Sequence, residues 1–244
     1  MIRGVLFDKD DTLLDLATFW RAPVQRTVDF MLRELRHENN QALRHALECA
    51  AGFDGDALIA ESPVVAGTNA DVVRACMDVL AAQNIDVIDR SLFARLAETY
   101  LEISCLRDGV CQPTGDLAYV LDALHAQNIR TGVATSDSFA STMHALEKMG
   151  VAEKFDCILT ADRVARPKPA PDMAMVFCAR CSLTPEEVAM VGDSANDMRF
   201  ARNADLTAIY LDRAAAIDCD AKLVLEGDYR IQHIEDVVAL LTDL

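Results

Sequence analysis

The chain has 244 residues, of which 52% are apolar, so it suits one domain with an insertion, or a large and a small domain. Its formal net charge is −16 and its pI is about 4.6, which argues against nucleic acid and anionic membranes as partners. An anionic small molecule is not excluded, because salt screens charges beyond roughly 8–10 Å and a local basic pocket can decide binding.

The chain reaches Asp8 before any long apolar stretch and has no run of roughly 20 apolar residues, so we expect neither a signal peptide nor a membrane span. Eight cysteines in such a chain are typical of reduced thiols in the cytoplasm. Cys178 and Cys181 form a C-x-x-C pair in an apolar, helix-like stretch without a second pair. We interpret both as buried helix thiols rather than as a redox or zinc site.

The first predicted element is a short buried strand over residues 4–7, which ends in the carboxylates Asp8, Asp10 and Asp11. These charges must lie in a loop at the carboxyl end of the strand, where open α/β sheets bind ligands. Asp8 and Asp10 are two residues apart in an extended segment and so point the same way. Like charges so close are relieved by a cation or a shared proton. The pair is a candidate for metal binding or acid–base chemistry, although turns and helix caps also use aspartate.

Residues 16–110 show apolar residues at helical spacing and no evident strand, which predicts an inserted, all-helical segment. The clearest amphipathic stretches are residues 27–36, 41–51, 71–82 and 91–106. Residues 52–55 and 61–68 are predicted to be connecting loops.

From Pro113 onward, strand and helix patterns alternate, which predicts an α/β fold with a doubly wound parallel sheet. The predicted strands cover residues 129–134, 157–160, 188–191, 206–211 and 222–225. The predicted helices cover residues 115–127, 139–149, 172–181, 198–202 and 234–241.

Three predicted strands end in polar clusters, and these ends share one edge of a parallel sheet. The clusters are Asp8 with Asp10, Thr135 with Ser136, and Asp193 with Asp197. Lys168, from the loop 161–171, joins them. A carboxylate nucleophile, hydroxyl donors, a cation and a second acid pair are the groups that phosphoryl transfer requires. That reaction depends mostly on positioning and electrostatics.

These motifs, in this order, resemble the haloacid dehalogenase (HAD) superfamily in its phosphatase branch, including phosphoglycolate phosphatase-like members. The resemblance covers nearly the whole chain and rests on residues 8–12, Thr135, Lys168 with Pro169, and residues 192–197. It implies a Rossmann-like core of residues 1–15 and 111–244, and a smaller helical cap domain of residues 16–110. Hinges are expected at residues 14–16 and 108–113.

The resemblance also implies roles for individual residues. Asp8 would be the nucleophile that forms an aspartyl-phosphate, and Asp10 would protonate the leaving group and then activate water. Thr135 would hydrogen-bond a phosphoryl oxygen, with Ser136 assisting through its backbone. Lys168 would bridge the nucleophile and the phosphate.

The same resemblance implies a Mg²⁺ site. Asp8 and Asp193 would hold the ion with the backbone carbonyl of Asp10, and Asp197 would support the ion or orient Lys168. Mg²⁺ suits such an oxygen-only set. One departure concerns Asp11, because family members often carry glycine there. Glycine tolerates a positive φ angle, and aspartate does so less readily.

The sequence separates some chemistries within the family. Dehalogenases lack the second acid, which Asp10 supplies here, and phosphonatases need a cap lysine, whereas residues 16–110 contain none. A phosphomutase stays open, because it uses the same two aspartates. A non-catalytic binding scaffold is a further alternative. A receiver-type signalling domain fits less well, because it places its phosphorylated Asp on a middle strand and is about half as long.

Substrate choice is assigned to the insertion. Arg21 and Arg166 are candidates for a second anionic group, and Phe19 and Trp20 for cleft or core. By analogy, the partner is a small phosphorylated metabolite, such as a phosphoglycolate-like ester. All five histidines, at positions 37, 45, 125, 144 and 233, are interpreted as structural or surface residues. The sequence does not indicate the oligomeric state.

Overall fold

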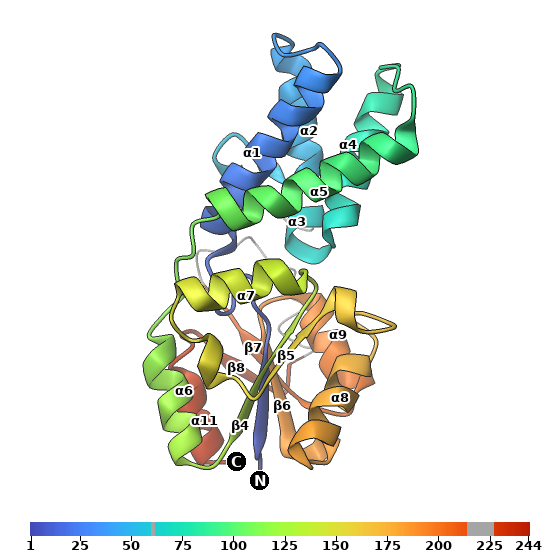
Figure 1. Cartoon of the computed structure of the whole chain (residues 1–244). Helices are drawn as coiled ribbons and strands as arrows, with labels where there is room; N and C mark the ends of the chain where they lie inside the picture. The colour runs from blue at the N-terminus through green and yellow to red at the C-terminus, as the bar shows by residue number, and fades with distance from the viewer. Residues whose placement is uncertain (60–61, 214–226) are drawn as a thin grey trace. The chain divides into compact units, whose positions relative to one another are not determined.

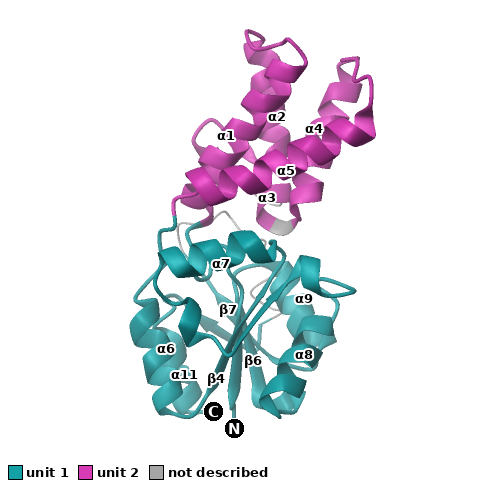
Figure 2. Ribbon diagram, viewed as in Figure 1, with its two compact units in different colours: residues 1–15, 111–244 teal, residues 16–110 magenta. Residues whose placement is uncertain are grey.

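The computed structural model describes residues 1–59, 62–213 and 227–244 (Figure 1). The chain divides into two compact units, coloured separately in Figure 2. Residues 1–15 and 111–244 form one, here called the α/β unit, and residues 16–110 form the other, here called the helical unit.

The α/β unit is built on a six-stranded sheet with the order β5-β4-β1-β6-β7-β8, in which all neighbouring strands are parallel. The strands are β1 (Gly4–Phe7), β4 (Arg130–Thr135), β5 (Cys157–Thr160), β6 (Val188–Gly192), β7 (Thr207–Leu211) and β8 (Tyr229–Ile231). From β1 the order runs outward to β5 on one side and resumes with β6 on the other. This is the topology of a doubly wound sheet, so the predicted fold class is confirmed.

Helices cover both faces of this sheet, because alternate residues of β1 point to opposite sides. Val5 and Phe7 pack with α6 (Leu117–Ala126) and α11 (Asp236–Thr242). Leu6 packs with α8 (Asp172–Cys181) and α9 (Ala195–Asn203) on the other face. The helix α7 (Phe139–Lys148) contributes Leu146 to the first cluster. Short 3₁₀ turns cover Ala152–Lys154, Ala161–Arg163 and Pro185–Glu187.

The helical unit consists mainly of two pairs of helices: α1 packs against α5, and α2 packs against α4. Its helices are α1 (Leu16–Glu34), α2 (Gln41–Ala51), α3 (Pro63–Ala66), α4 (Asn69–Ala82) and α5 (Arg90–Asp108). Between α1 and α5, Phe30 stacks on Phe93 and Tyr100, with ring centroids 6.2 and 4.7 Å apart. Aromatic pairs at this separation add to the energy of apolar burial.

Short elements account for the differences from prediction in this unit. The predicted loop at residues 52–55 contributes to a hairpin of β2 (Phe53–Asp54) and β3 (Ala57–Leu58), and α3 lies within the loop predicted at residues 61–68. Two-residue strands and a one-turn helix are too short to show a period. The helix α1 also begins well before the predicted residues 27–36.

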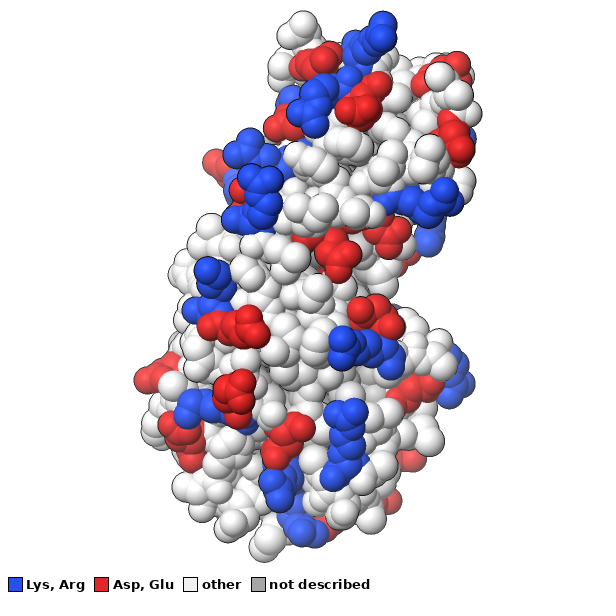
Figure 3. Space-filling view, viewed as in Figure 1, with Lys and Arg blue, Asp and Glu red and all other residues white. Residues whose placement is uncertain are grey.

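In the α/β unit, predicted and observed strands agree to within one residue at β1, β4, β5, β6 and β7. The strand predicted at residues 222–225 lies outside the described residues, and β8 (Tyr229–Ile231) was not predicted. In the part of the chain that the structure describes, no helix combines the length and the apolar character that a membrane span requires. On the face shown in Figure 3, basic and acidic side chains are interspersed over both units.

Candidate active site

The carboxyl ends of three adjacent strands bring the predicted residues of the α/β unit together. β1 lies between β4 and β6, with Phe7 in register with Val133 and Val191. The backbone N–H of Asp8 donates to the carbonyl of Val191 at 2.9 Å, which holds the residue after β1 against β6. Parallel strands present their carboxyl ends at one edge.

The loop after β1 folds back on itself. The carbonyl of Lys9 accepts hydrogen bonds from the N–H groups of Leu13 and Leu14, both at 2.9 Å. This turn places Asp11 at a φ of 56°, in the left-handed region. Aspartate adopts this region more readily than most residues. Arg213, just after β7, lies 3.3 Å from the carboxylate of Asp11, so the charge that replaces the usual glycine is paired.

Lys168 lies buried between two carboxylates. Its ammonium nitrogen donates to Asp8 Oδ1 at 2.6 Å and to Asp197 Oδ1 at 2.5 Å. Burial alone would lower the pKa of Lys168, but Asp197 and Asp8 outweigh it and hold that pKa above its ordinary value. Burial raises the pKa of Asp8 from 3.8 to about 7, with Asp197 and Asp10 adding to the rise and Lys168 opposing it. Further positive charge would therefore favour the ionised Asp8.

Three carboxylates form a group that fits a hard cation. One carboxylate oxygen each from Asp8, Asp193 and Asp197 lies within 4.8 Å of the other two. Burial, followed by the charges of Asp197, Asp11 and Asp8, raises the pKa of Asp193 well above its ordinary value. The hydroxyl of Thr12 donates to Asp193 at 3.1 Å. An oxygen-only donor set with excess negative charge is what Mg²⁺ prefers.

Besides contacting Lys168, Asp197 caps the helix α9. Its Oδ2 accepts hydrogen bonds from the backbone N–H of Ser194 at 3.2 Å and from the Ser194 hydroxyl at 2.5 Å, which closes a capping box at the start of α9. A Cβ atom added at Gly192 would lie 2.4 Å from the carboxylate carbon of Asp197, so only glycine allows this approach. The cap therefore orients the oxygen that meets Lys168.

The end of β4 supplies hydroxyl groups. Thr135 is buried, and its hydroxyl oxygen accepts a hydrogen bond from the backbone N–H of Asp137 at 3.1 Å, which leaves the hydroxyl proton free to donate elsewhere. Ser136 follows and is partly buried. Asp137 itself belongs to a contact that the sequence analysis did not foresee.

That contact centres on Lys9, which the sequence analysis missed. Its side chain is 0% exposed, and its ammonium nitrogen lies 2.7 Å from Asp10 and 3.0 Å from Asp137. Burial would lower the pKa of Lys9, but the two carboxylates raise it. The carboxylate of Asp10 is thus held by Lys9 and lies outside the group formed by Asp8, Asp193 and Asp197. The only sequence signal was a lysine inside an acidic strand end.

Three residues predicted as candidates for substrate binding make other contacts. Phe19 and Trp20 are buried and meet edge to face, with ring centroids 5.6 Å apart. Arg21 forms an ion pair with Asp56 and lies over the ring of Phe53, 5.6 Å from its centroid. All of these contacts lie within the helical unit.

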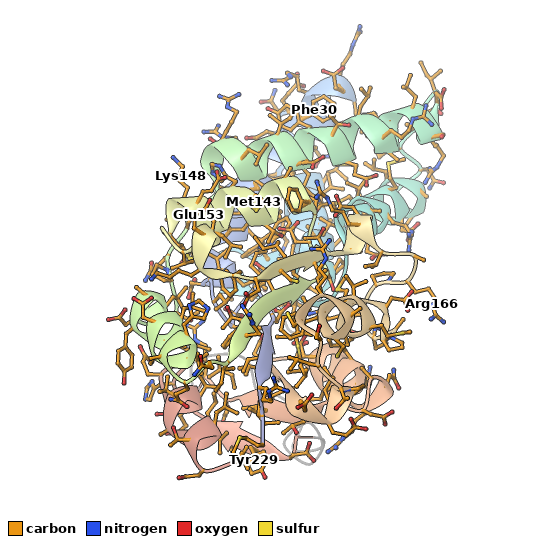
Figure 4. The ribbon with its side chains drawn as sticks, turned by 60° about the horizontal axis from the view of Figure 1, so that its bottom comes forward. Phe30, Met143, Lys148, Glu153, Arg166 and Tyr229 are labelled. Carbon is orange, nitrogen blue, oxygen red and sulfur yellow. The ribbon has the colours of Figure 1, made fainter. Side chains whose placement is uncertain are left out.

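Arg166 is also engaged elsewhere. Its guanidinium donates to both carboxylate oxygens of Asp172, at 3.2 and 2.8 Å. The side chain is 68% exposed, and Figure 4 shows it pointing away from the ribbon. Asp172 begins α8, where a carboxylate is favoured by the helix dipole. This pairing accounts for Arg166 without a bound anion.

The sequence matches the model of the family described as haloacid dehalogenase-like hydrolase over residues 2–205. A phosphoglycolate phosphatase of Salmonella paratyphi A is 29% identical over 217 residues, which cover 86% of this chain and 81% of that protein. The pyrophosphatase PpaX of Oceanobacillus iheyensis is 24% identical over 248 residues, which cover 99% of this chain and 98% of that protein.

A solved structure shares the fold along almost the whole chain. The crystal structure of a predicted phosphoglycolate phosphatase from Haemophilus somnus superposes with a TM-score of 0.71 and 16% sequence identity. The superposition covers 98% of each chain.

Proposed function

This chain belongs to the haloacid dehalogenase-like hydrolase family, and from that membership we propose that it is a Mg²⁺-dependent phosphatase of a small phosphomonoester, working through an aspartyl-phosphate. The observation that carries the proposal is the contact of Lys168 with both Asp8 and Asp197, beside Asp193. It supports the proposal because a carboxylate suited to be the nucleophile, a buried ammonium group and a group of oxygens suited to a metal ion lie close together.

In the first step, an oxygen of the Asp8 carboxylate attacks phosphorus, and the bond from phosphorus to the ester oxygen breaks. Asp10 gives its proton to the departing alkoxide. The ammonium of Lys168 and the hydroxyl of Thr135 would neutralise charge on the phosphoryl oxygens. The nucleophile must be ionised, and Lys168 favours that state by lowering the pKa of Asp8 against the effect of burial.

In the second step, Asp10 takes a proton from water, whose oxygen attacks phosphorus. The bond from phosphorus to Asp8 breaks, which releases phosphate and restores both carboxyl groups. Mg²⁺ held by Asp8, Asp193, Asp197 and the backbone carbonyl of Asp10 would supply further charge neutralisation. Lys9, through its contact with Asp10, keeps the acid in place between the two steps.

We also propose separate roles for the two units. We assign residues 16–110 the role of a cap that admits substrate and excludes water, with hinges where the chain passes between the units at residues 15–16 and 110–111. The names of the relatives do not agree on one substrate, because one is named for phosphoglycolate and another for pyrophosphate. A phosphoglycolate-like ester is the substrate we would test first.

The test is release of phosphate from 2-phosphoglycolate, other phosphorylated metabolites and pyrophosphate, with Mg²⁺ and with a chelator. We expect activity with Mg²⁺ only, and a loss on the order of 10³-fold or more in Asp8→Asn. Asp172→Asn is the matched control, since this acid pairs with the exposed Arg166. Activity that survives Asp8→Asn would refute the nucleophile. No release of phosphate from any of these compounds, together with isomerisation of sugar phosphates, would favour a phosphomutase.

A further inference from the structure

The helical unit carries a second group of metal-ligating side chains, which differs in chemistry from the acidic site. His45 and Cys49 belong to α2, and Asp54 belongs to β2. One ligand atom from each of the three lies within 4.8 Å of the other two. From the sequence, His45 is expected to be a structural or surface residue. The sequence signal for this group is a cysteine four residues after that histidine.

Local structure explains how the three residues meet. Residues four apart on a helix share a face, so His45 and Cys49 are neighbours on α2. The helix ends at Gly52, whose φ of 143° lies in a region that side chains rarely adopt, and its N–H donates to the carbonyl of Glu48 at 2.9 Å. The chain turns back there into the β2–β3 hairpin, which places Asp54 beside the last turn of α2.

The distances are close to those of a tetrahedral site. Cys49 Sγ lies 3.7 Å from His45 Nε2, and that nitrogen lies 3.9 Å from Asp54 Oδ1. Zinc bound by sulfur at about 2.3 Å, and by nitrogen and oxygen at about 2.0–2.2 Å, holds such atoms roughly 3.3–3.6 Å apart. Because Cys49 Sγ also lies 3.8 Å from His45 Nδ1, a rotation of the imidazole ring would be needed to aim one ring nitrogen at the ion. Because His45 and Asp54 are exposed, such movement meets little steric resistance.

We propose that His45, Cys49 and Asp54 form a zinc site of the helical unit, with water as the fourth ligand. A thiolate, an imidazole and a carboxylate suit Zn²⁺ and other borderline divalent metals far better than Mg²⁺. The partial negative charge at the carboxyl end of α2 favours a cation near Cys49. The bound ion would tie α2 to the β2–β3 hairpin. This inference does not depend on the proposed function.

The first test uses Co²⁺ as a spectroscopic substitute for Zn²⁺, with the full chain in excess Mg²⁺. A thiolate bound to Co²⁺ gives near-ultraviolet charge-transfer absorption, which the oxygen ligands of the acidic site do not. We expect this absorption in the wild type and in Cys111→Ser, a control at another partly exposed thiol, and not in Cys49→Ser. Its absence from the wild type, or its survival in Cys49→Ser, would overturn the proposal.

The second test is the affinity for Zn²⁺, measured by competition with a chromophoric chelator. His45→Gln and Asp54→Asn should each weaken binding by about 10-fold or more, since removing a ligand exceeds the effect of disturbing its support. His37→Gln, at the other histidine of the helical unit, should bind as the wild type does. Equal affinity in His45→Gln and the wild type would remove the basis for the site.

Discussion

Two lysines, Lys9 and Lys168, are buried beside the carboxylates of the candidate active site, and each bridges two acids. A buried charge is tolerated when its partners lie close enough to offset the loss of hydration. Lys168 is predictable from the sequence, because its loop carries a family motif. Lys9 is not, because no pattern in a single strand end reveals that Asp137, far along the chain, lies 3.0 Å away.

At this scale we predict that Lys9→Met lowers kcat more than it changes KM. Without Lys9, the carboxylates of Asp10 and Asp137 lose their buried cation, and Asp10 is no longer held in place. The uncompensated charge should also cost about 3–5 kcal/mol of stability. Steady-state kinetics and urea unfolding measure the two effects.

The double variant Lys9→Met with Asp137→Asn separates charge balance from positioning. If the ion pair explains the loss, this variant should regain part of the stability, and the double-mutant cycle should show coupling between the two positions. Additive losses would contradict the contact. Wild-type kcat in Lys9→Met would contradict the role assigned to this residue.

Helix caps decide where elements begin, and they also shape the site. The apolar pattern predicts helices that begin at Asp71 and Met198, whereas α4 begins at Asn69 and α9 begins at Ala195. In both cases a hydroxyl residue followed three positions later by aspartate closes a capping box. In α9 the same aspartate turns its other oxygen to Lys168. Helix capping and site geometry therefore rest on one residue, Asp197.

The capping box at the start of α4 allows a prediction about stability that does not involve the candidate active site. Asp71 accepts hydrogen bonds from the backbone N–H of Thr68 at 2.9 Å and from its hydroxyl at 2.8 Å. Partial burial raises the pKa of Asp71, but these bonds and Arg74 outweigh it, and the pKa falls below 3.8. We expect Asp71→Asn to lower stability at neutral pH by about 0.5 kcal/mol, because the carboxylate is partly exposed.

The pH dependence gives the sign of this effect. A lowered folded-state pKa stabilises the protein above the unfolded value of 3.8, and that stability is lost as the pH falls through the folded value. The difference between the wild type and Asp71→Asn should therefore shrink in acid. Urea unfolding from neutral pH down to below 3.8 measures this difference in stability. A difference that does not change with pH would show that the charge of Asp71 does not contribute to it.

At the scale of the whole molecule, negative charge converges on one sheet edge. The chain carries a formal charge of −16, and Asp8, Asp193 and Asp197 meet only when β1 and β6 pair. The unfolded chain does not assemble this group, so a cation bound there stabilises the folded state alone. Cation binding and folding of the α/β unit would thus be linked.

We predict that Mg²⁺ raises the thermal midpoint, by roughly 5–10 °C when its concentration is about 100 times Kd. Burial raises the folded pKa of Asp8 to about 7 from 3.8, so the stability from its protonated form is lost as pH rises through about 7. Mg²⁺ should offset that loss, and its effect should weaken below pH 7. Calorimetry with Mg²⁺ or chelator, on the wild type and Asp193→Asn, measures this. The same shift in Asp193→Asn would contradict the site.

The sequence alone determined the parallel α/β fold, because strand and helix periods and the turn residues between them are local properties. It also predicted that Asp8 and Asp193 lie close together, since the ends of parallel strands must share an edge, and the family motif added Lys168 from its loop. Only the tertiary structure decided that Lys9 pairs with Asp10 and Asp137 and that Asp11 pairs with Arg213. It also decided that His45, Cys49 and Asp54 come together. The contacts of Lys9 with Asp137 and of Asp11 with Arg213 join residues far apart in the chain. The energies of all these contacts depend on distance and burial, which a linear pattern does not contain.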